Sequence, residues 1–448
     1  MKLFAHAALL PQGWADDVLI DLDVDGSIAS VRANASPEGA TRVDGPLVPG
    51  MPNLHSHAFQ RALAGRTGGG GGSGDSFWTW RQAMYAFLDR VDADAFEAIA
   101  AQSYVEMLKA GYTAVAEFHY VHHDPAGRPY ADPAELARRI VAAASETGIA
   151  LTLLPVFYAH AGFGGIPPTP GQRRFVQPID SFARLVAALA NDAKGFTLGV
   201  APHSLRAVTP DELAAVVALA PAGAPIHIHA AEQLREVAEC VAWSGAPPVD
   251  WLLDHAGVDG RWCVVHATHM TGVATTRLAA SGAIAGLAPT TEADLGDGTF
   301  RARAYIDAGG AFGIGSDSNT IIDPFAELRQ LEWSQRLAFF ERNVLAGDAV
   351  PVGQSLYTDA ARGGGAAVAK SLGAIAAGTR ADLLVLNLDD PALSEVPRDA
   401  LLDAAIFGPC RRPVRDVMVG GRWAVRDGRH PREEAIFARY RKAMAAMS

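Results

Sequence analysis

The chain has 448 residues, of which 49% are hydrophobic and 19% are charged, and its formal net charge is −11. This composition is typical of a soluble globular protein and excludes a disordered chain, while the acidic balance argues against a nucleic-acid-binding surface. No stretch approaches the roughly 20 uncharged apolar residues of a membrane span, so we predict no membrane association. An anionic substrate would have to be bound by local arginines.

The N-terminus and the cysteines together predict a cytoplasmic location. Residues 1–14 contain one lysine and an apolar run that is broken by His6 and Pro11, and they lack the features of a signal peptide. The three cysteines lie far apart and form no CxxC pair, which predicts free thiols in a reducing compartment. They are Cys240, Cys263 and Cys410.

Segments near the two ends of the chain share one pattern. Residues 14–32 alternate apolar and polar side chains around an Asp-Gly turn, which is typical of a β-hairpin. Residues 381–389 and 414–429 show similar short strands and glycine turns. We therefore predict one small β-sandwich domain built from both termini, followed by an amphipathic helix. The predicted boundaries are 1–47 and 366–430 for the β-domain, 48–365 for the domain between them, and 431–448 for the helix.

The middle of the chain repeats a strand, a loop and a helix. Its strands are nearly continuous apolar runs, and helical stretches such as 93–111 and 131–148 separate most of them. This pattern is typical of a parallel sheet that is covered on both faces. Eight strands predict an α/β fold of the (β/α)8 or TIM-barrel type, although a doubly wound sheet has the same local pattern. The predicted strands are 47–57, 113–121, 150–159, 196–204, 225–232, 262–269, 283–291 and 311–318.

Polar residues recur at the carboxyl ends of these strands, which favours the barrel. A barrel enzyme builds its active site at that face, from the ends of several strands. An i, i+2 histidine pair on an extended segment directs both imidazoles to the same side, where they can share one ion. The residues at the strand ends are His55, His57, Glu117, His119, His203, His229, His266 and Asp317.

Some of these side chains predict a site for one divalent metal. A single HxH pair is a weak signal, because histidines also satisfy hydrogen bonds inside protein cores. A second pair, His227 and His229, ends the fifth strand, and a carboxylate follows the eighth strand, where burial requires a partner or a metal. Three imidazoles and one carboxylate suit zinc or ferrous iron, with zinc as the first expectation. The candidate ligands are His55, His57, one histidine of the pair His227 and His229, and Asp317.

This combination of motifs resembles the amidohydrolase superfamily. The shared features are HxH on the first strand, HxxE on the fifth, His on the sixth and Asp on the eighth, together with the β-domain segment 372–387. The resemblance implies that His55, His57, His229 and Asp317 are the metal ligands and that His227 has a structural role. The sequence does not separate His266 from its neighbour His269 with certainty. The catalytic residues that it implies are Glu232, His266 and Asp317.

The lysines indicate one metal rather than two. Binuclear members of that superfamily bridge their metals with a carbamylated lysine, usually on the fourth strand. Lys194 precedes the fourth strand at its wrong end, and Lys109 lies in a helix before the second strand. We therefore expect the mononuclear deaminase branch, in which the metal activates one water. Asp317 would accept a proton, Glu232 would protonate the departing nitrogen, and His266 would stabilise the reacting centre.

Five loop segments resemble one group more closely, the formimidoylglutamate deiminases of bacterial histidine degradation. They are 51–65, 77–85, 116–123, 201–208 and 289–298. The resemblance implies hydrolysis of N-formimidoyl-L-glutamate to N-formyl-L-glutamate and ammonia, by a homodimer. A dicarboxylate also suits arginines, which pair with carboxylates in bidentate fashion. The implied substrate-binding residues are Gln60, Arg81, Tyr120, His203 and Arg206.

Other interpretations stay open at this point. Another mononuclear aminohydrolase, acting on a purine, pyrimidine or guanidino compound, would need aromatic stacking more than two arginines. A non-catalytic barrel would lack proton-transfer residues, whereas Glu232, His266 and Asp317 are all present. The glycine run 68–72 is consistent with a mobile lid or with a tolerated surface insertion.

Overall fold

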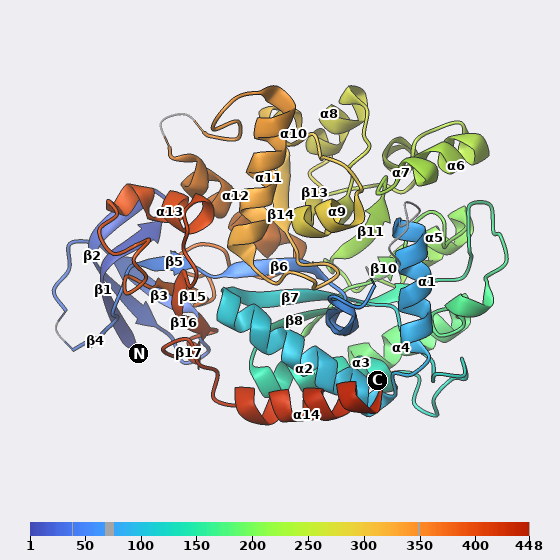
Figure 1. Ribbon diagram of the computed structural model, residues 1–448, viewed down its shortest axis with the longest axis horizontal. Helices are drawn as coiled ribbons and strands as arrows, with labels where there is room; N and C mark the ends of the chain where they lie inside the picture. The colour runs from blue at the N-terminus through green and yellow to red at the C-terminus, as the bar shows by residue number, and fades with distance from the viewer. Residues whose placement is uncertain (38, 68–75, 348–349, 448) are drawn as a thin grey trace.

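Short parallel strands at the centre of the molecule form the barrel that the sequence predicts (Figure 1). The computed structural model describes residues 1–37, 39–67, 76–347 and 350–447, so the glycine run 68–72 and its predicted lid lie outside the described residues. All eight predicted strands form. In chain order they are β6 (Met51–Ser56), β7 (Tyr112–His119), β8 (Ala150–Phe157), β9 (Thr197–Leu198) with β10 (Ala201–Pro202), β11 (Ile226–Ala230), β12 (Trp262–His266), β13 (Ile284–Leu287) and β14 (Ala311–Ile314).

Parallel pairing joins these strands into a closed ring. β6, β7, β8 and β10 pair side by side, β9 also pairs with β8, and β11 to β14 pair in chain order. Isolated parallel bridges close the two seams: Val200 pairs with Ile226 and Ser204 with His229 at one, and Ser56 pairs with Asp317 at the other. The predicted (β/α)8 fold is therefore confirmed. The seam between its first and last strands lies at the predicted metal site.

The fourth barrel strand is the least regular, because it is split into β9 and β10. Between the two pieces, Gly199 packs so closely on the segment before β11 that a Cβ atom would lie 2.5 Å from the carbonyl oxygen of Pro225. Only glycine fits such an approach without displacement. The backbone N–H of His203, just after β10, donates to the carbonyl oxygen of Phe157 at 3.0 Å. The irregular strand therefore still delivers His203 to the carboxyl face of the barrel.

Helices follow the strands and cover the barrel. The predicted helices 93–111 and 131–148 form as α2 (Ala93–Ala110) and α3 (Glu135–Thr147). The carboxylate of Asp92 caps α2 by accepting from the backbone N–H of Ala95 at 2.8 Å. The other helices are α1 (Phe77–Leu88), α4 (Ile179–Asn191), α5 (Pro210–Ala218), α6 (Leu234–Ser244), α7 (Pro248–His255), α8 (Gly272–Ala280), α9 (Pro289–Leu295), α10 (Ala302–Asp307), α11 (Pro324–Phe339), α12 (Val352–Ala367), α13 (Leu401–Phe407) and α14 (Glu433–Ala446).

The two ends of the chain meet in one mixed sheet beside the barrel, at the left of Figure 1. Antiparallel pairing of Leu384 with Val48 joins the C-terminal strands to the N-terminal ones. Leu3, Ile20 and Leu383 belong to an apolar core that is separate from that of the barrel, as expected of the predicted β-domain. The strands are β1 (Lys2–Leu10), β2 (Gly13–Leu22), β3 (Ile28–Arg32), β4 (Thr41–Arg42), β5 (Leu47–Pro49), β15 (Leu383–Leu386), β16 (Val414–Val419) and β17 (Arg422–Val425).

The C-terminal region holds one expected helix and one unexpected helix. α14 forms as predicted and packs along α2, where Lys109 Nζ lies 2.6 Å from a carboxylate oxygen of Glu433. The sequence did not predict α13, which interrupts the β-domain between β15 and β16. Cys240, Cys263 and Cys410 are free, as predicted. Across the described ranges, no helix combines the length and the apolar character needed to cross a membrane.

Candidate active site

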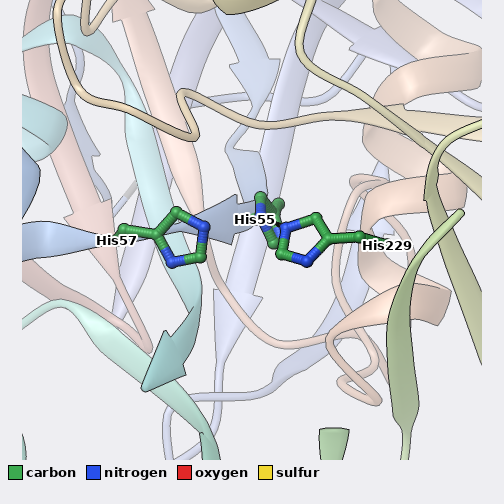
Figure 2. A group of neighbouring side chains, drawn as sticks. All are labelled: His55, His57 and His229. Atoms are coloured by element: carbon green, nitrogen blue, oxygen red, sulfur yellow. Dashed lines mark hydrogen bonds between the residues drawn. The ribbon is translucent and has the colours of Figure 1, made fainter. Parts of the chain in front are cut away.

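Three buried histidines converge at the carboxyl ends of β6 and β11. Figure 2 shows the imidazoles of His57 and His229 approaching from opposite sides, with His55 between them. The potential ligand nitrogens of the three side chains all lie within 4.8 Å of one another. Nε2 of His55 and Nε2 of His229 are 3.1 Å apart. The structure thus brings together the three imidazoles that the sequence predicts as metal ligands.

Backbone carbonyl groups fix the orientation of two of these rings. Nδ1 of His57 lies 3.0 Å from the carbonyl oxygen of Phe118, and Nδ1 of His229 lies 3.0 Å from that of His203. A carbonyl oxygen only accepts, so each Nδ1 carries the hydrogen and each Nε2 presents a lone pair to the centre. Burial lowers the pKa of His57 to about 3 and holds the pKa values of His55 and His229 well below their usual range. All three imidazoles are therefore neutral, as metal ligation requires.

Asp317, the fourth predicted ligand, lies beside these histidines just after the last barrel strand. Its Oδ1 lies 3.4 Å from Nε2 of His57 and 3.6 Å from Nε2 of His55. The backbone N–H of Asp317 donates to the carbonyl oxygen of His55, and the N–H of His57 donates to that of Asp317, both at 3.0 Å. These bonds hold Asp317 in a left-handed conformation, with a φ of 42°. Burial raises the pKa of its carboxyl group to about 7, which a bound cation would lower.

His266 lies among carboxylates on the other side of Asp317. Nε2 of His266 is 3.7 Å from Glu232 and 3.8 Å from Asp317, while its Nδ1 is 3.4 Å from Glu292. Although burial lowers the pKa of His266, the surrounding carboxylates, Glu232 foremost, raise it to about 10. The ring is therefore a cation at neutral pH. Its Nε2–H faces the predicted proton-transfer residue and the predicted ligand.

The structure distinguishes the roles of His269 and His227 from those of the histidines in the site. The ring of His269 packs against Gly298, whereas His266 faces Glu232. The ring of His227 points away from the metal cluster, because its Nε2 lies 2.9 Å from the carbonyl oxygen of Ala367. His227 therefore serves the packing of the barrel against α12, in agreement with the structural role that the resemblance implied.

The five predicted substrate-binding residues line the same pocket as His57, His229, Glu232, His266 and Asp317. Three of the five, Gln60, Tyr120 and His203, form a neutral group beside the three-histidine cluster. The side-chain amide of Gln60 donates to the hydroxyl oxygen of Tyr120 at 2.8 Å. The ring of Tyr120 packs at 4.9 Å from that of His57, and the ring of His203 at 4.9 Å from that of His229. Burial holds the pKa of His203 well below its usual range, so its ring is neutral.

The two arginines supply positive charge to the same pocket from different elements. Arg206, in the loop after β10, is buried, and its Nη2 lies 3.5 Å from a carboxylate oxygen of Glu232. Arg81 lies on α1, with its guanidinium carbon 4.5 Å from the ring centre of Trp78. The sequence therefore identified the two arginines of the pocket lining.

Several side chains around the site were not singled out from the sequence. Glu292 and Glu236 are buried carboxylates that face His266 and Arg206, respectively. Glu292 lies within the segment 289–298 that carried the resemblance, and Glu236 follows Glu232 by four residues, in the first turn of α6. These spacings were the sequence signals that could have identified the two residues.

Glu117, which the sequence placed at a strand end, lies behind the three-histidine cluster. There its carboxylate accepts a hydrogen bond from the backbone N–H of Ala58 at 2.7 Å.

Comparisons with known proteins agree with this arrangement. The family described as "Amidohydrolase family" matches residues 47–424, and that described as "Formimidoylglutamate deiminase HutF, N-terminal domain" matches residues 2–45. The chain is 53% identical to a formimidoylglutamate deiminase from Pseudomonas aeruginosa over 96% of both chains. It is 26% identical to an 8-oxoguanine deaminase from the same organism, over 90% of this chain and 87% of that protein.

Solved structures extend the similarity to the whole fold. The crystal structure of an amidohydrolase from Brucella melitensis matches with a TM-score of 0.94 and 48% identity, over 100% of this chain and 99% of that chain. Atrazine chlorohydrolase TrzN from Arthrobacter aurescens, complexed with zinc, matches with a TM-score of 0.83 over 100% of both chains. At 19% identity, the second likeness concerns the fold alone.

Proposed function

The chain belongs to the amidohydrolase family, and within it to the formimidoylglutamate deiminases, and from this premise we propose how the residues of the pocket divide the work. The protein is a metal-dependent hydrolase that converts N-formimidoyl-L-glutamate and water into N-formyl-L-glutamate and ammonia in histidine degradation. One observation carries this conclusion in the structure: two arginines and a group of neutral donors share a pocket with a three-histidine cluster.

His55, His57, His229 and Asp317 would hold one divalent metal, with zinc as the first choice. Neutral imidazole nitrogens together with one carboxylate are donors that zinc prefers. When bound, the ion lowers the pKa of a water molecule and so supplies the nucleophile near neutral pH. The carbonyl partners of His57 and His229 support this assignment, because they orient both Nε2 lone pairs toward the same point.

Three side chains would move or stabilise protons and charge. Asp317 lies beside the ligand nitrogens and would take the proton of the attacking water. The new C–O bond makes the formimidoyl carbon tetrahedral, and the cationic His266 would stabilise the charge that develops there. Glu232 would then take up the hydroxyl proton of the tetrahedral carbon and deliver it to the terminal nitrogen, so that the carbonyl group forms, this C–N bond breaks and ammonia leaves. Protonation at the other nitrogen would release formamide, so the position of Glu232 decides the products.

The two groups of polar side chains would bind the two carboxylates of the substrate. Only one carbon separates the α-carboxylate from the amidine nitrogen, so this carboxylate must lie close to the metal cluster. Gln60, Tyr120 and His203 lie there, against His57 and His229. The side-chain carboxylate reaches further, and it would pair with Arg81 and Arg206.

The experiment that tests this function is a metal analysis combined with a substrate panel. We expect about one zinc per chain and ammonia release from N-formimidoyl-L-glutamate. Guanine, cytosine and N-guanidinoglutarate represent the purine, pyrimidine and guanidino classes, and we expect no turnover of them. Absence of activity on N-formimidoyl-L-glutamate in the metal-loaded protein would refute the assignment.

Three further expectations belong to the same proposal. A homodimer is expected, and light scattering of the purified protein would test it. A cytoplasmic location is consistent with three free cysteines, and cell fractionation would test it. The proposed division of the chain into 1–47, 48–365, 366–430 and 431–448 places its last boundary beside the exposed Pro431 and Arg432, where limited proteolysis would test it.

A further inference from the structure

The first turn of α6 carries two neighbouring charged residues that face the two arginines of the pocket. α6 begins just after Glu232, and Arg235 and Glu236 both lie in its first turn. Arg235 extends toward α1, which carries Arg81, and Glu236 points into the interior toward Arg206. α1 and α6 lie on the same side of the barrel, at the right of Figure 1. Neither Arg235 nor Glu236 lines the pocket itself.

Arg235 reaches Arg81 through the ring of Trp78. The guanidinium carbon of Arg235 is 4.4 Å from the ring centre of Trp78, and that of Arg81 is 4.5 Å from the same ring centre. One indole of α1 therefore contacts a cation from its own helix and a cation from α6. Such contacts attract guanidinium groups to the ring and fix their planes.

This contact holds Arg81 without using its hydrogen-bond donors. Within the described ranges, Arg81 forms no ion pair with a carboxylate, and its buried Nε has no hydrogen-bond partner. An arginine that is held by an aromatic ring keeps its N–H groups available for an anionic ligand. Trp78 itself does not line the pocket, so its effect on a substrate would be exerted through Arg81.

Glu236 acts on Arg206 from the opposite side of the site. Its side chain is fully buried, and one carboxylate oxygen accepts from the backbone N–H of Glu232 at 3.0 Å. The other carboxylate oxygen lies 3.9 Å from Nε of Arg206, which is an ion-pair distance, and neither atom has a hydrogen-bond partner among the described residues. A buried carboxylate is costly without a cation beside it. Glu236 therefore fixes the Nε side of Arg206, while the far end of that guanidinium faces the pocket.

We propose that the first turn of α6 positions both pocket arginines, so that Trp78, Arg235 and Glu236 are positioning residues for the side-chain carboxylate of the substrate. This inference rests on the proposed function, because it assumes that Arg81 and Arg206 bind that carboxylate. The same turn follows Glu232, whose backbone N–H is bonded to Glu236. One short segment thus sets the distance between Glu232, the proton donor, and the two arginines that would bind the side-chain carboxylate. It thereby sets the length of the substrate side chain that the pocket accepts.

Steady-state kinetics of the metal-loaded enzyme test the Arg81 part of this proposal. Trp78→Leu removes the ring, and we expect KM to rise about tenfold while kcat changes by less than about twofold. Trp78→Phe keeps an aromatic face and should restore most of the KM. Arg235→Met should raise KM by a few-fold. Glu239→Gln is the matched control, because it breaks only the exposed ion pair between Glu239 and Arg235, at 2.7 Å, and should leave KM unchanged.

Double variants show whether the effect passes through the arginines. In an Arg81→Met background, Trp78→Leu should raise KM by less than about a further twofold, because the guanidinium that Trp78 is proposed to hold is absent. Glu236→Gln should raise KM in the native background and add little in an Arg206→Met background. If Glu236→Gln does not fold, Glu236→Asp keeps the charge at a greater distance and should give a smaller rise.

The possible outcomes separate this inference from the proposed function. Wild-type enzyme that does not release ammonia from N-formimidoyl-L-glutamate would overturn both. Active wild-type enzyme whose KM is unchanged by Trp78→Leu and Glu236→Gln would overturn the inference alone. The inference also fails if the single and double variants give fully additive effects, or if kcat and zinc content fall while KM stays constant.

Discussion

The predicted metal ligands and the two pocket arginines, Arg81 and Arg206, share one pocket, but different parts of the fold hold them in place. His55, His229 and Asp317 sit at the ends of strands, and hydrogen bonds of the backbone fix their positions. Arg81 and Arg206 lie in a helix and a loop, and contacts between side chains fix them. Strand ends give a rigid frame for a reacting centre, whereas side-chain contacts can be tuned for a particular substrate. Substitutions of the predicted metal ligands should therefore abolish the reaction, and substitutions of the two arginines should weaken substrate binding.

The largest effect is expected from removal of one metal ligand. His229→Asn should lower kcat/KM by on the order of 10⁴-fold and remove the metal, because the remaining donors leave the site incomplete. Zinc analysis and the ammonia assay measure both. His227→Asn is the matched control, since the ring of His227 binds the carbonyl oxygen of Ala367 and not the cluster. Loss of zinc in both variants would contradict the separate roles of these histidines.

A smaller loss is expected when the metal stays and proton transfer fails. Glu232→Gln keeps the shape of the side chain but cannot deliver a proton to the departing nitrogen. We expect kcat to fall by about 10² to 10³-fold with zinc retained. Formamide should be assayed alongside ammonia, because Glu232 is proposed to direct which C–N bond breaks. Turnover at the wild-type rate would remove Glu232 from the proposed chemistry.

Removal of either arginine should affect binding more than turnover, and the two variants should differ in stability. Arg81→Met and Arg206→Met should each raise KM by about 10 to 100-fold, because a charge-assisted pair with the substrate is lost. Arg206→Met also leaves the buried carboxylate of Glu236 without its cation. We therefore expect a loss of about 3 kcal/mol in the free energy of unfolding for Arg206→Met and little change for Arg81→Met. Equal stability of the two variants would argue against the buried pair.

The smallest effect on activity is expected at Glu117, which lies behind the three-histidine cluster and affects the pH dependence of stability. Burial raises the pKa of its carboxyl group to about 8, above the value of about 4.3 expected in the unfolded chain. The folded state therefore binds the proton more tightly, and the stability from this group is present at low pH and is lost as the pH rises toward 8. Glu117→Gln should remove this dependence, so that the change in the free energy of unfolding between pH 5.5 and pH 8, measured with urea, differs from wild type by about 3 kcal/mol. Parallel stability curves would contradict the assignment.

The amino-acid sequence by itself determined the barrel and most of the chemistry. Apolar runs and helical periods are local properties, so the eight strands and the helices α2, α3 and α14 could be placed without tertiary information. The direction of side chains along a strand is local too, and HxH already directs His55 and His57 to one side. The family resemblance then supplied the substrate. The split of the fourth strand escaped prediction, because it depends on the close packing of Gly199 against a different strand.

Only the tertiary structure decided which of several similar residues meet. It placed His266 rather than His269 beside Glu232, and it turned His227 away from the cluster. It also showed that Trp78 lies between Arg81 and Arg235, which belong to helices far apart in the chain. The physical reason is that strand and helix periods act over a few residues, whereas the packing of one helix against another depends on how the whole barrel closes. The sequence determined the reactive groups, and the fold decided which of them hold the others in place.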